Sequence, residues 1–290
     1  MYLADGWKDY EIIDAGNDEK LERWGDVVLL RPDPQAIWPM KNNRNYDAHY
    51  TRSNSGGGAW TFNRRLPESW TIRYRDLRFI VKPTGFKHTG IFPEQSVNWD
   101  FMRSVVEKHI KVTGRPFRVL NLFAYTGGAT VALAAAGAEV VHVDAAKGIV
   151  AWAKNNLAES GLADRPVRFI VDDVMKFVQR EKRRGREYEG ILMDPPSYGR
   201  GPDGEMWRIE NGLYPLVSEC MDLMSSDAGF FIINSYTTGL APTVLRNVLK
   251  VAVGGRGGSI EAQEIGLPIT ENDLILPCGC TARWYKEPRK

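Results

Sequence analysis

The segment Asp194-Pro195-Pro196-Ser197-Tyr198 contains residue types that could hold and orient a nucleophile. The two prolines fix the backbone and supply no N–H, which leaves the Asp194 side chain and nearby carbonyl oxygens as hydrogen-bond acceptors. Such a cluster could bind the N–H groups of an amine and turn its lone pair toward an electrophile, with Asp194 as an orienting group or weak base. Tyr198 could stack on a planar substrate, including an extruded base. We predict Asp194, Pro195, Pro196 and Tyr198 as catalytic residues, against the alternative of a strand that ends in a rigid turn.

Glycine and aspartate follow three further segments that have the pattern of buried strands. Gly127 and Gly128 would let the backbone pass close to a ligand at a helix N-terminus. Asp144 could accept hydrogen bonds from both hydroxyls of a ribose, and Asp172 or Asp173 could accept one from an adenine amine, although each could instead cap a helix. The three-glycine fingerprint of dinucleotide sites is absent, which disfavours an NAD-dependent oxidoreductase. A nucleoside-containing ligand without a pyrophosphate fits these residues, and S-adenosylmethionine meets that description.

The elements that would position these residues alternate between strands and helices from Arg118 onward. Short apolar and β-branched runs predict strands over 118–124, 139–143, 167–171, 190–193 and 229–234. The intervening segments predict helices over 127–136, 147–159, 174–183, 213–224 and 242–251. This series indicates an α/β fold with a doubly wound parallel sheet, in which ligands bind at the carboxyl ends of the strands. Two closing segments, 259–265 and 281–285, could add an antiparallel edge.

The residues before this series have a different pattern. Gly, Pro and Asn separate short extended segments at 10–13, 27–30, 60–62, 71–74 and 79–81. A helix over 97–109 would lead from these segments into the alternating series. The sequence therefore predicts a small β-rich domain over residues 1–95 and a catalytic domain over residues 96–290.

Charge is unevenly distributed within the first domain. The whole chain has a formal net charge of +2. Residues 1–40 carry four cations and nine anions, a net charge of −5, whereas residues 41–78 carry eight cations and three anions, a net charge of +5. This basic segment also contains aromatic residues such as Tyr50, Trp60 and Phe62, a mixture that suits nucleic acid because cations contact phosphates while rings stack on bases. A β-rich module with a polar outer face is the alternative, which composition alone favours.

Composition excludes several classes of protein. Hydrophobic residues make up 43% and charged residues 26% of the 290 residues, which argues against intrinsic disorder. The longest apolar stretch, 130–143, is interrupted by Glu139 and His142 and is shorter than a membrane span. Three cysteines cannot form a disulfide framework, two late thiols are too few for a zinc site, and the first residues lack a secretory pattern. We expect a cytoplasmic protein with no metal and no membrane partner.

Residues 118–236 resemble the S-adenosylmethionine-dependent ribosomal RNA methyltransferases related to the large-subunit cytosine-5 enzymes. The matching segments are NLFAYTGG at 121–128, VDAAKGIVAWAKNN at 143–156, FIVDDVMKF at 169–177 and DPPSYG at 194–199, with GFKHTGIFPEQ at 85–95 similar to a segment that borders the cofactor in that family. The resemblance implies a class I methyltransferase fold, Rossmann-like, with a doubly wound seven-stranded sheet. It also implies cofactor contacts at Thr89, Gln95, Phe123, Tyr125, Gly127, Asp144 and Asp173. The predicted cofactor-binding set further includes His88, Asn121, Ala124, Thr126, Ala145 and Asp172.

One departure from this family changes the expected chemistry. Members that methylate cytosine C5 use a cysteine nucleophile after the fifth strand, where this chain reads NSYTTG at 234–239. Cys278 and Cys280 could replace that cysteine in space, although a buried or incidental role is favoured. We therefore predict methyl transfer from S-adenosylmethionine to a nitrogen of a nucleobase. The expected partner is an RNA substrate, and the expected kind of RNA is ribosomal RNA.

Other readings of the sequence stay open. A small molecule or a protein side chain is the alternative acceptor, and a nucleic-acid-binding module without catalysis is a further alternative. Steep loss of substrate affinity with rising salt would distinguish an RNA enzyme from a small-molecule enzyme. The oligomeric state, including a homo-oligomer, also stays open.

Overall fold

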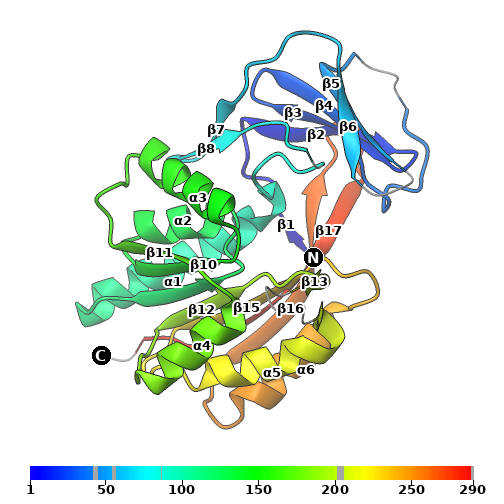
Figure 1. Ribbon diagram of the computed structural model, residues 1–290. Coiled ribbons are helices and arrows are strands. Elements are labelled where there is room, and N and C mark those ends of the chain that lie inside the picture. Colours follow the sequence, from blue (N-terminus) through cyan, green and yellow to red (C-terminus); the bar gives the residue numbers. More distant parts are fainter. Residues whose placement is uncertain (42–44, 54–56, 86, 201–205, 289–290) are drawn as a thin grey trace. The chain divides into compact units, whose positions relative to one another are not determined.

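Figure 1 shows the computed structural model, which describes residues 1–41, 45–53, 57–85, 87–200 and 206–288. Arg44 of the basic segment and Phe86 of the segment at 85–95 lie outside the described residues. The chain divides into unit 1, Met1–Val97 with Ile265–Cys278, and unit 2, Asn98–Glu264 with Gly279–Lys290. The division into domains 1–95 and 96–290 stays a prediction.

Unit 2 is built on a mostly parallel sheet. Its strands follow the order β17-β15-β12-β9-β10-β11, with β16 beside β17. Their bounds are β9 (Arg118–Leu122), β10 (Glu139–Asp144), β11 (Val167–Val171), β12 (Gly190–Met193), β15 (Phe230–Ser235), β16 (Ser259–Pro268) and β17 (Ile275–Tyr285). Strand β17 pairs antiparallel with β15, and β9 pairs parallel with both β10 and β12. The order reverses between β9 and β12, so the carboxyl ends of these two strands flank the ligand position of a doubly wound sheet.

Helices cover both faces of this sheet (Figure 1). Helix α2 (Gly128–Ala135) packs against α3 (Lys147–Glu159), and α1 (Ser96–Thr113) precedes β9. On the other face α5 (Ile209–Met221) packs against both α4 (Val174–Arg183) and α6 (Pro242–Val253). No described helix combines the length and the apolar character that a membrane span requires. The alternating series predicted from the sequence is therefore present in unit 2.

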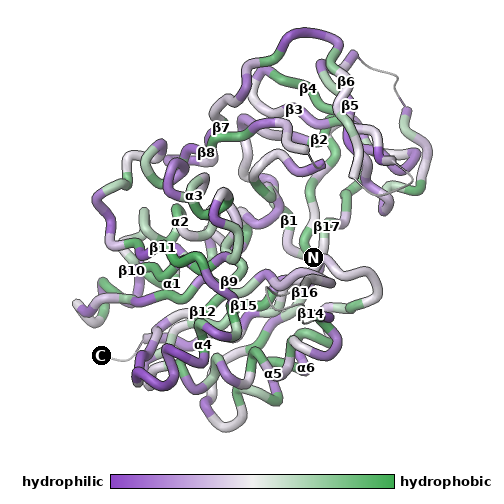
Figure 2. Tube along the Cα trace, viewed as in Figure 1, coloured by the Kyte–Doolittle hydropathy of each residue, from purple (hydrophilic) through white to green (hydrophobic). Residues whose placement is uncertain are grey.

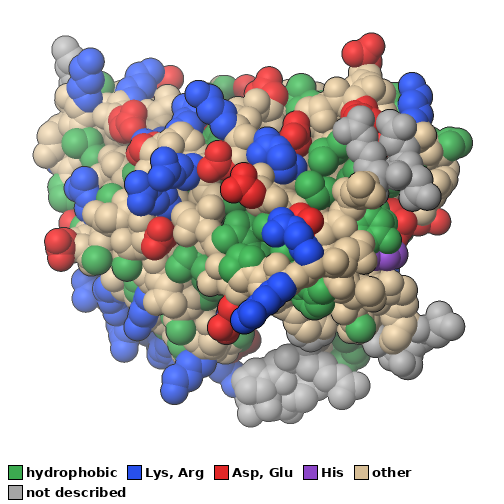
Figure 3. Space-filling model, turned by 90° about the horizontal axis from the view of Figure 1, so that it is seen from above, with side chains coloured by type: hydrophobic (Ala, Val, Ile, Leu, Met, Phe, Trp, Pro, Cys, Tyr) green, Lys and Arg blue, Asp and Glu red, His purple; other side chains and the backbone are tan. Residues whose placement is uncertain are grey.

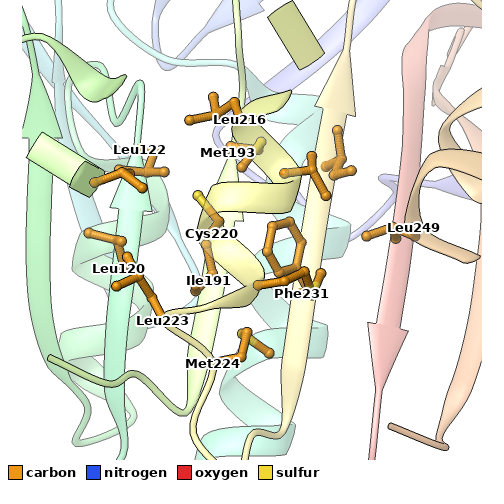
Figure 4. Close-up of a cluster of buried hydrophobic side chains, with 14 of the residues drawn as sticks. Leu120, Leu122, Ile191, Met193, Leu216, Cys220, Leu223, Met224, Phe231 and Leu249 are labelled. Atoms are coloured by element: carbon orange, nitrogen blue, oxygen red, sulfur yellow. The ribbon is translucent and has the colours of Figure 1, made fainter. Parts of the chain in front are cut away.

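A hydrophobic core fixes the central strands against α5 (Figure 4). Leu120, Ile191 and Phe231, on three neighbouring strands, are fully buried together with Leu216 and Cys220 of α5. Burying an aliphatic or aromatic side chain of this size contributes roughly 1.5–3 kcal/mol to stability. Figure 2, coloured by hydropathy, shows hydrophobic residues along the strands and hydrophilic residues along α4. The strands whose ends carry the candidate residues are therefore anchored by this core.

Unit 1 contains a five-stranded sheet of order β2-β3-β4-β5-β6 and a separate hairpin, counted over the described residues. The sheet strands are β2 (Tyr10–Gly16), β3 (Glu19–Trp24), β4 (Val27–Pro32), β5 (Ala48–Arg52) and β6 (Gly58–Phe62). The hairpin consists of β7 (Trp70–Tyr74) and β8 (Leu77–Val81), and β1 (Tyr2–Leu3) pairs with the part of β16 at Ile265 and Gly266. Strands β3 and β5 were not predicted, because charged and polar residues interrupt their apolar pattern.

Three of the six aromatic residues of the basic segment contribute to the fold of unit 1. Tyr50 and Tyr74 are almost completely buried, and Trp70 donates its indole N–H to the carbonyl of Trp24 at 2.8 Å. Arg64 is held by two hydrogen bonds to the carboxylate of Asp47. Much of the basic segment therefore fits the alternative interpretation, a β-rich module with a polar outer face.

Candidate functional site

The loop after β9, at the edge of the unit 2 sheet, has an unusual backbone conformation. Phe123, Tyr125 and Gly127 all have positive φ, at 53°, 51° and 82°. The backbone N–H of Ala124 donates to the carbonyl of Val143 at 3.1 Å, which ties the loop to β10. Two residues with side chains in the left-handed region cost free energy, which the surrounding hydrogen bonds must offset.

Asp144, at the end of β10, supplies part of that compensation. Its Oδ2 accepts the backbone N–H of Tyr125 at 3.0 Å, and its Oδ1 accepts that of Ala146 at 2.9 Å. Ala145, which lies between Asp144 and Ala146 in the chain, is exposed. Each carboxylate oxygen keeps acceptor capacity after one such bond, so Asp144 can both shape the loop and bind hydroxyl groups of a ligand.

Asn156 of α3 fixes the other side of the same loop. Its buried Nδ2 donates to the carbonyl of Thr126 at 2.8 Å, and Thr126 itself is 1% exposed. Asn156 was not predicted as a site residue, although it lies in the segment at 143–156 that carries the family resemblance. The sequence signal that could have indicated it is the pair of asparagines at 155–156 inside a predicted helix.

Gly127 and Gly128 allow the loop to approach α1 and α3 closely. A Cβ on Gly127 would lie 2.9 Å from the Cβ of Ala153, and a Cβ on Gly128 would lie 2.7 Å from the indole of Trp99. Gly127 is the N-cap of α2, and no side chain caps that helix. An uncapped helix start next to a carboxylate suits a ligand with both an anionic group and hydroxyls.

Asn121 lies beneath this loop rather than at its surface. Its Nδ2 donates to the hydroxyl of Thr130 at 2.9 Å, and the same hydroxyl lies 2.9 Å from Nδ1 of His142. All three side chains are buried, and Nε2 of His142 has no hydrogen-bond partner among the described residues. Burial lowers the pKa of His142 to about 3. The three residues form a polar layer that supports the loop from below.

The two aspartates after β11 have structural partners. Asp173 is the N-cap of α4, where its Oδ1 accepts the backbone N–H of Lys176 at 2.9 Å. Asp172 forms an ion pair with Arg180, one turn further along α4. Both side chains are partly buried. Asp173 therefore acts as the helix cap that the sequence left as an alternative. Its other carboxylate oxygen is the atom that could accept a hydrogen bond from a ligand.

The segment after β12 presents hydrogen-bond acceptors next to β9. Asp194 is partly buried and its N–H points to the carbonyl of Leu122 at 3.4 Å, while Pro195 is buried. The hydroxyl of Ser197 lies 2.7 Å from that of Thr237, which follows β15. Residues from three strand ends thus meet at the point where the strand order reverses.

Trp207 holds this segment, and the sequence did not predict it. Its indole N–H donates to the carbonyl of Pro196 at 2.6 Å, and its ring lies 5.9 Å from that of Phe123. A Cβ on Gly212 would lie 2.4 Å from the same indole. Trp207 therefore connects the loop after β9 with the segment after β12.

A short hairpin carries both Trp207 and Tyr198. Its strands are β13 (Tyr198–Arg200) and β14 (Met206–Arg208). Tyr198 is 50% exposed, and its hydroxyl donates to the sulfur of Met206 at 2.9 Å. The Gly-Pro-Asp-Gly run at 201–204 is a turn signal that could have indicated a hairpin here, although strands of three residues have no usable periodicity.

None of the three cysteines of the chain has the surroundings of a nucleophile. Cys280 pairs in register with Ser235, but it is 5% exposed, its thiol donates to the carbonyl of Leu240, and burial raises its pKa to about 11. Burial also raises the pKa of Cys220, in the core of Figure 4, and of Cys278, in unit 1. A reactive cysteine needs a lowered pKa and access to substrate.

The remaining predicted cofactor residues belong to unit 1. Thr89 is fully buried, and its hydroxyl has no hydrogen-bond partner among the described residues. Gln95 ends the short helix η1 (Pro93–Gln95) and is 8% exposed. His88 is exposed at its surface, and desolvation together with the charge of Arg31 lowers its pKa to about 4. The structure describes these residues within unit 1 and does not place them relative to the unit 2 residues.

Comparison with known proteins agrees with this geometry. A family model described as S-adenosylmethionine-dependent methyltransferase matches residues 35–206. The crystal structure of the SAM dependent methyltransferase from Agrobacterium tumefaciens is 36% identical, with a TM-score of 0.92 over 98% of this chain and 92% of that chain. A methyltransferase structure complexed with SAH, at 19% identity and a TM-score of 0.72, covers 96% of this chain and 76% of that chain and shares the fold.

A curated relative is similar to part of the chain. "Ribosomal RNA large subunit methyltransferase K/L" of Shewanella baltica is 31% identical over 207 residues, which are 70% of this chain and 27% of the relative. The chain thus matches about a quarter of the length of that relative. The class I methyltransferase fold with an N-terminal β-rich sheet, predicted from the sequence, is confirmed by these likenesses.

Proposed function

The chain belongs to the S-adenosylmethionine-dependent methyltransferase family, and we propose that it transfers the methyl group to a nitrogen of a nucleobase in ribosomal RNA. The predicted enzyme class and cofactor are confirmed by that membership. Bound S-adenosylmethionine supplies a methyl group on a positively charged sulfur. In our proposal Asp194 would hold the accepting nitrogen through its N–H and would take up the proton that this nitrogen loses when it is methylated.

The residues around the loop after β9 fit this cofactor. In our proposal the Asp144 carboxylate binds the ribose hydroxyls while it also holds the Tyr125 N–H. The start of α2 at Gly127 accepts the methionine carboxylate, and Asp173 or Asp172 accepts the adenine amine. Thr89 of unit 1, whose buried hydroxyl has no hydrogen-bond partner among the described residues, is proposed as a cofactor residue on the resemblance of the segment at 85–95.

Asp194 and the two following prolines are the observation on which the acceptor assignment rests. Because Pro195 and Pro196 have no N–H, this strand end offers acceptors, and Trp207 occupies the carbonyl of Pro196. The Asp194 carboxylate is then the group that binds an N–H of the base and holds the nitrogen in line with the sulfonium methyl. Precise alignment of the two reactants supplies much of the rate in such a displacement.

The state of the cysteines supports nitrogen rather than a ring carbon as the acceptor. A ring carbon of cytosine must first be made nucleophilic by covalent addition of a thiolate. Burial raises the pKa of all three thiols, and Ser235 and Thr237 occupy the strand end where such a cysteine would be expected. A nitrogen carries its own lone pair and needs no such addition.

The name of the curated relative supports ribosomal RNA as the substrate, and a ribosomal substrate supports a cytoplasmic location. In this proposal residues 1–95 form a small β-rich domain that assists substrate binding, and residues 96–290 form the catalytic domain. Tyr198, half exposed on the hairpin beside Trp207, is proposed to stack on the base.

Mass spectrometry of nucleosides from cells with and without this chain tests the proposal. We expect one N-methylated nucleoside to disappear from large ribosomal RNA when the chain is absent and to return with the wild type but not with Asp194→Ala. Transfer of a radiolabelled methyl group to total RNA should show the same dependence. A methylated small molecule or protein in place of RNA, or full activity of Asp194→Ala, would contradict it.

A further inference from the structure

We propose that Arg52, Trp60, Phe62 and Lys87 form an RNA-binding strip on unit 1 that holds a single-stranded segment of the substrate. This inference rests on the proposed RNA methyltransferase function and adds the location of a docking surface. The strip lies on the hairpin β5–β6, labelled in Figure 1, and on the loop that follows β8.

The strand register places the first three residues on one face. Tyr50 pairs with Trp60, Ala48 with Phe62 and Arg52 with Gly58. Because side chains alternate between faces along a strand, Arg52, Trp60 and Phe62 share the face that carries Tyr50. Tyr50 is buried beside Trp60 on that face, and the two rings make a T-shaped contact with centroids 5.3 Å apart.

Two aromatic rings on this face are ready to stack. The rings of Trp60 and Phe62 lie 6.3 Å apart at an interplanar angle of 28°, and Phe62 is 51% exposed. The indole N–H of Trp60 donates to the carbonyl of Thr84 at 2.8 Å, which fixes the ring before any ligand binds. Fixed, partly exposed rings bind unpaired bases at a small entropic cost and without sequence preference.

Two cations, Arg52 and Lys87, complete the strip. The hydroxyl of Thr84 donates to the carbonyl of His88, so the loop that carries Lys87 folds back toward Trp60. Burial together with Lys20 and Arg52 lowers the pKa of Lys87 to about 8, while the carboxylate of Asp33 acts in the opposite direction. Neither Arg52 nor Lys87 forms an ion pair with another described residue, whereas Arg64, which follows β6, is paired with Asp47. Phosphate groups would relieve this repulsion.

The occupant that fits is single-stranded RNA. A duplex hides the faces of its bases, so exposed rings gain nothing from it, whereas an unpaired strand offers bases to rings and phosphates to cations. Figure 3 shows one face of the molecule, with acidic side chains among the lysine and arginine side chains over its middle and further lysine and arginine side chains gathered at the lower left.

Fluorescence anisotropy with a short, labelled, unstructured RNA tests the strip in the full chain. We expect Phe62→Ala to raise Kd about tenfold through the loss of one stacked base. The double variant Arg52→Gln/Lys87→Gln should raise Kd and reduce the slope of log Kd against log salt by about 1.4, roughly 0.7 for each cation. The double variant Arg64→Gln/Arg65→Gln removes the same charge from the neighbouring segment and should change Kd less than twofold.

The proposal fails if Phe62→Ala or Arg52→Gln/Lys87→Gln binds the RNA with wild-type affinity. It also fails if the control variant weakens binding equally, or if unlabelled duplex RNA competes as strongly as unlabelled single-stranded RNA. A wild-type dimer that Phe62→Ala dissociates in sedimentation would assign the face to a second copy instead. Circular dichroism and unchanged affinity for S-adenosylhomocysteine establish that the variants are folded. If wild type methylates RNA and the strip variants behave as wild type, the strip alone fails; if wild type methylates no RNA, the proposed function fails.

Discussion

The proposed cofactor side and the proposed acceptor side of the unit 2 sheet edge are stabilised by different kinds of contact. On the cofactor side, at the ends of β9 and β10, Asp144 and Asn156 bind backbone groups of the loop through 3.0 and 2.8 Å hydrogen bonds. On the acceptor side, at the end of β12, Trp207 of an inserted hairpin binds the carbonyl of Pro196. The cofactor loop is therefore shaped by residues of the repeating βα scaffold, and the acceptor segment by an addition to it.

This difference has a functional reading. A cofactor common to a family can be bound by the common scaffold, whereas the acceptor differs between members and suits an element that can vary. If the division holds, substitutions on the cofactor side weaken binding of S-adenosylhomocysteine, and substitutions on the acceptor side lower turnover while that binding is kept. The variants below test the division in order of decreasing effect.

Asp194→Ala should have the largest effect. Loss of the carboxylate removes the group proposed to orient the nitrogen, and positioned groups of this kind contribute about 100-fold or more to kcat. We expect kcat to fall about 100-fold, with Kd for S-adenosylhomocysteine changed less than about twofold. Steady-state transfer of a radiolabelled methyl group and calorimetric titration measure the two quantities. Asp194→Asn keeps an acceptor oxygen and should retain more activity; a parallel loss of cofactor affinity would break the division.

Gly127→Ala should have the next largest effect, on the other side of the division. Gly127 has a φ of 82°, and a Cβ there would lie 2.9 Å from that of Ala153, so the loop must shift. A cost of about 2 kcal/mol for such a conformation corresponds to about 30-fold weaker binding of S-adenosylhomocysteine by calorimetry. Gly148→Ala is the matched control, because a Cβ there meets nothing within 4 Å. Equal affinity of the two variants would show that the loop does not contact the cofactor.

Trp207→Phe should have a smaller effect, on the acceptor side. The ring can still pack against Phe123 and Gly212, but the hydrogen bond to Pro196 is lost. One such bond contributes about 1 kcal/mol, so we expect kcat to fall about fivefold with little change in Kd for S-adenosylhomocysteine. Trp70→Phe removes the equivalent bond to Trp24 in unit 1 and should leave kcat unchanged. Loss of affinity for S-adenosylhomocysteine in Trp207→Phe would show that Trp207 contributes to cofactor binding as well as to the acceptor segment.

The proposed cofactor side and acceptor side also differ in how many of their residues could be predicted from the sequence. Strand ends of the βα series, including Asp144 and Asp194, were located because buried strands and helices of ordinary length have clear periodicity. Trp207 was not predicted because it lies on a strand of three residues, which is too short to show a periodic pattern. Asp173 stayed ambiguous because a helix cap and a ligand for adenine need the same residue at the same place, and the structure shows the cap.

Unit 1 shows a second limit of sequence reasoning. The basic segment has the composition of a nucleic-acid surface, but composition does not tell which rings face inward. Tyr50 and Trp60 form one cross-strand pair, and Tyr50 is buried while Phe62, two residues after Trp60, is half exposed. The residues 265–278 belong to unit 1 although they follow the whole βα series, a long-range grouping that no local pattern could indicate.

The polar layer beneath the cofactor loop should make stability depend on pH. Burial lowers the pKa of His142 to about 3, against roughly 6.5 in the unfolded chain. The unfolded chain therefore binds a proton more readily, so this contribution to stability is complete above about pH 6.5 and is lost as pH falls from there toward 3. Between pH 7.5 and pH 6 the expected loss is about 0.8 kcal/mol in the free energy of unfolding.

Urea denaturation of wild type and His142→Asn at both pH values measures this term. Asparagine can keep a polar atom near the Thr130 hydroxyl but does not titrate, so the variant is less stable at pH 7.5 and loses about 0.8 kcal/mol less on going to pH 6. His109, whose pKa burial also lowers, is distant from the loop in sequence, and His109→Asn is the control. Both variants should reduce the pH dependence of the free energy of unfolding. Because folded His142 stays neutral at pH 6, its affinity term for S-adenosylhomocysteine should be the same at both pH values. A loss of stability between pH 7.5 and pH 6 that is as large in His142→Asn as in wild type would show that His142 does not carry this pH dependence.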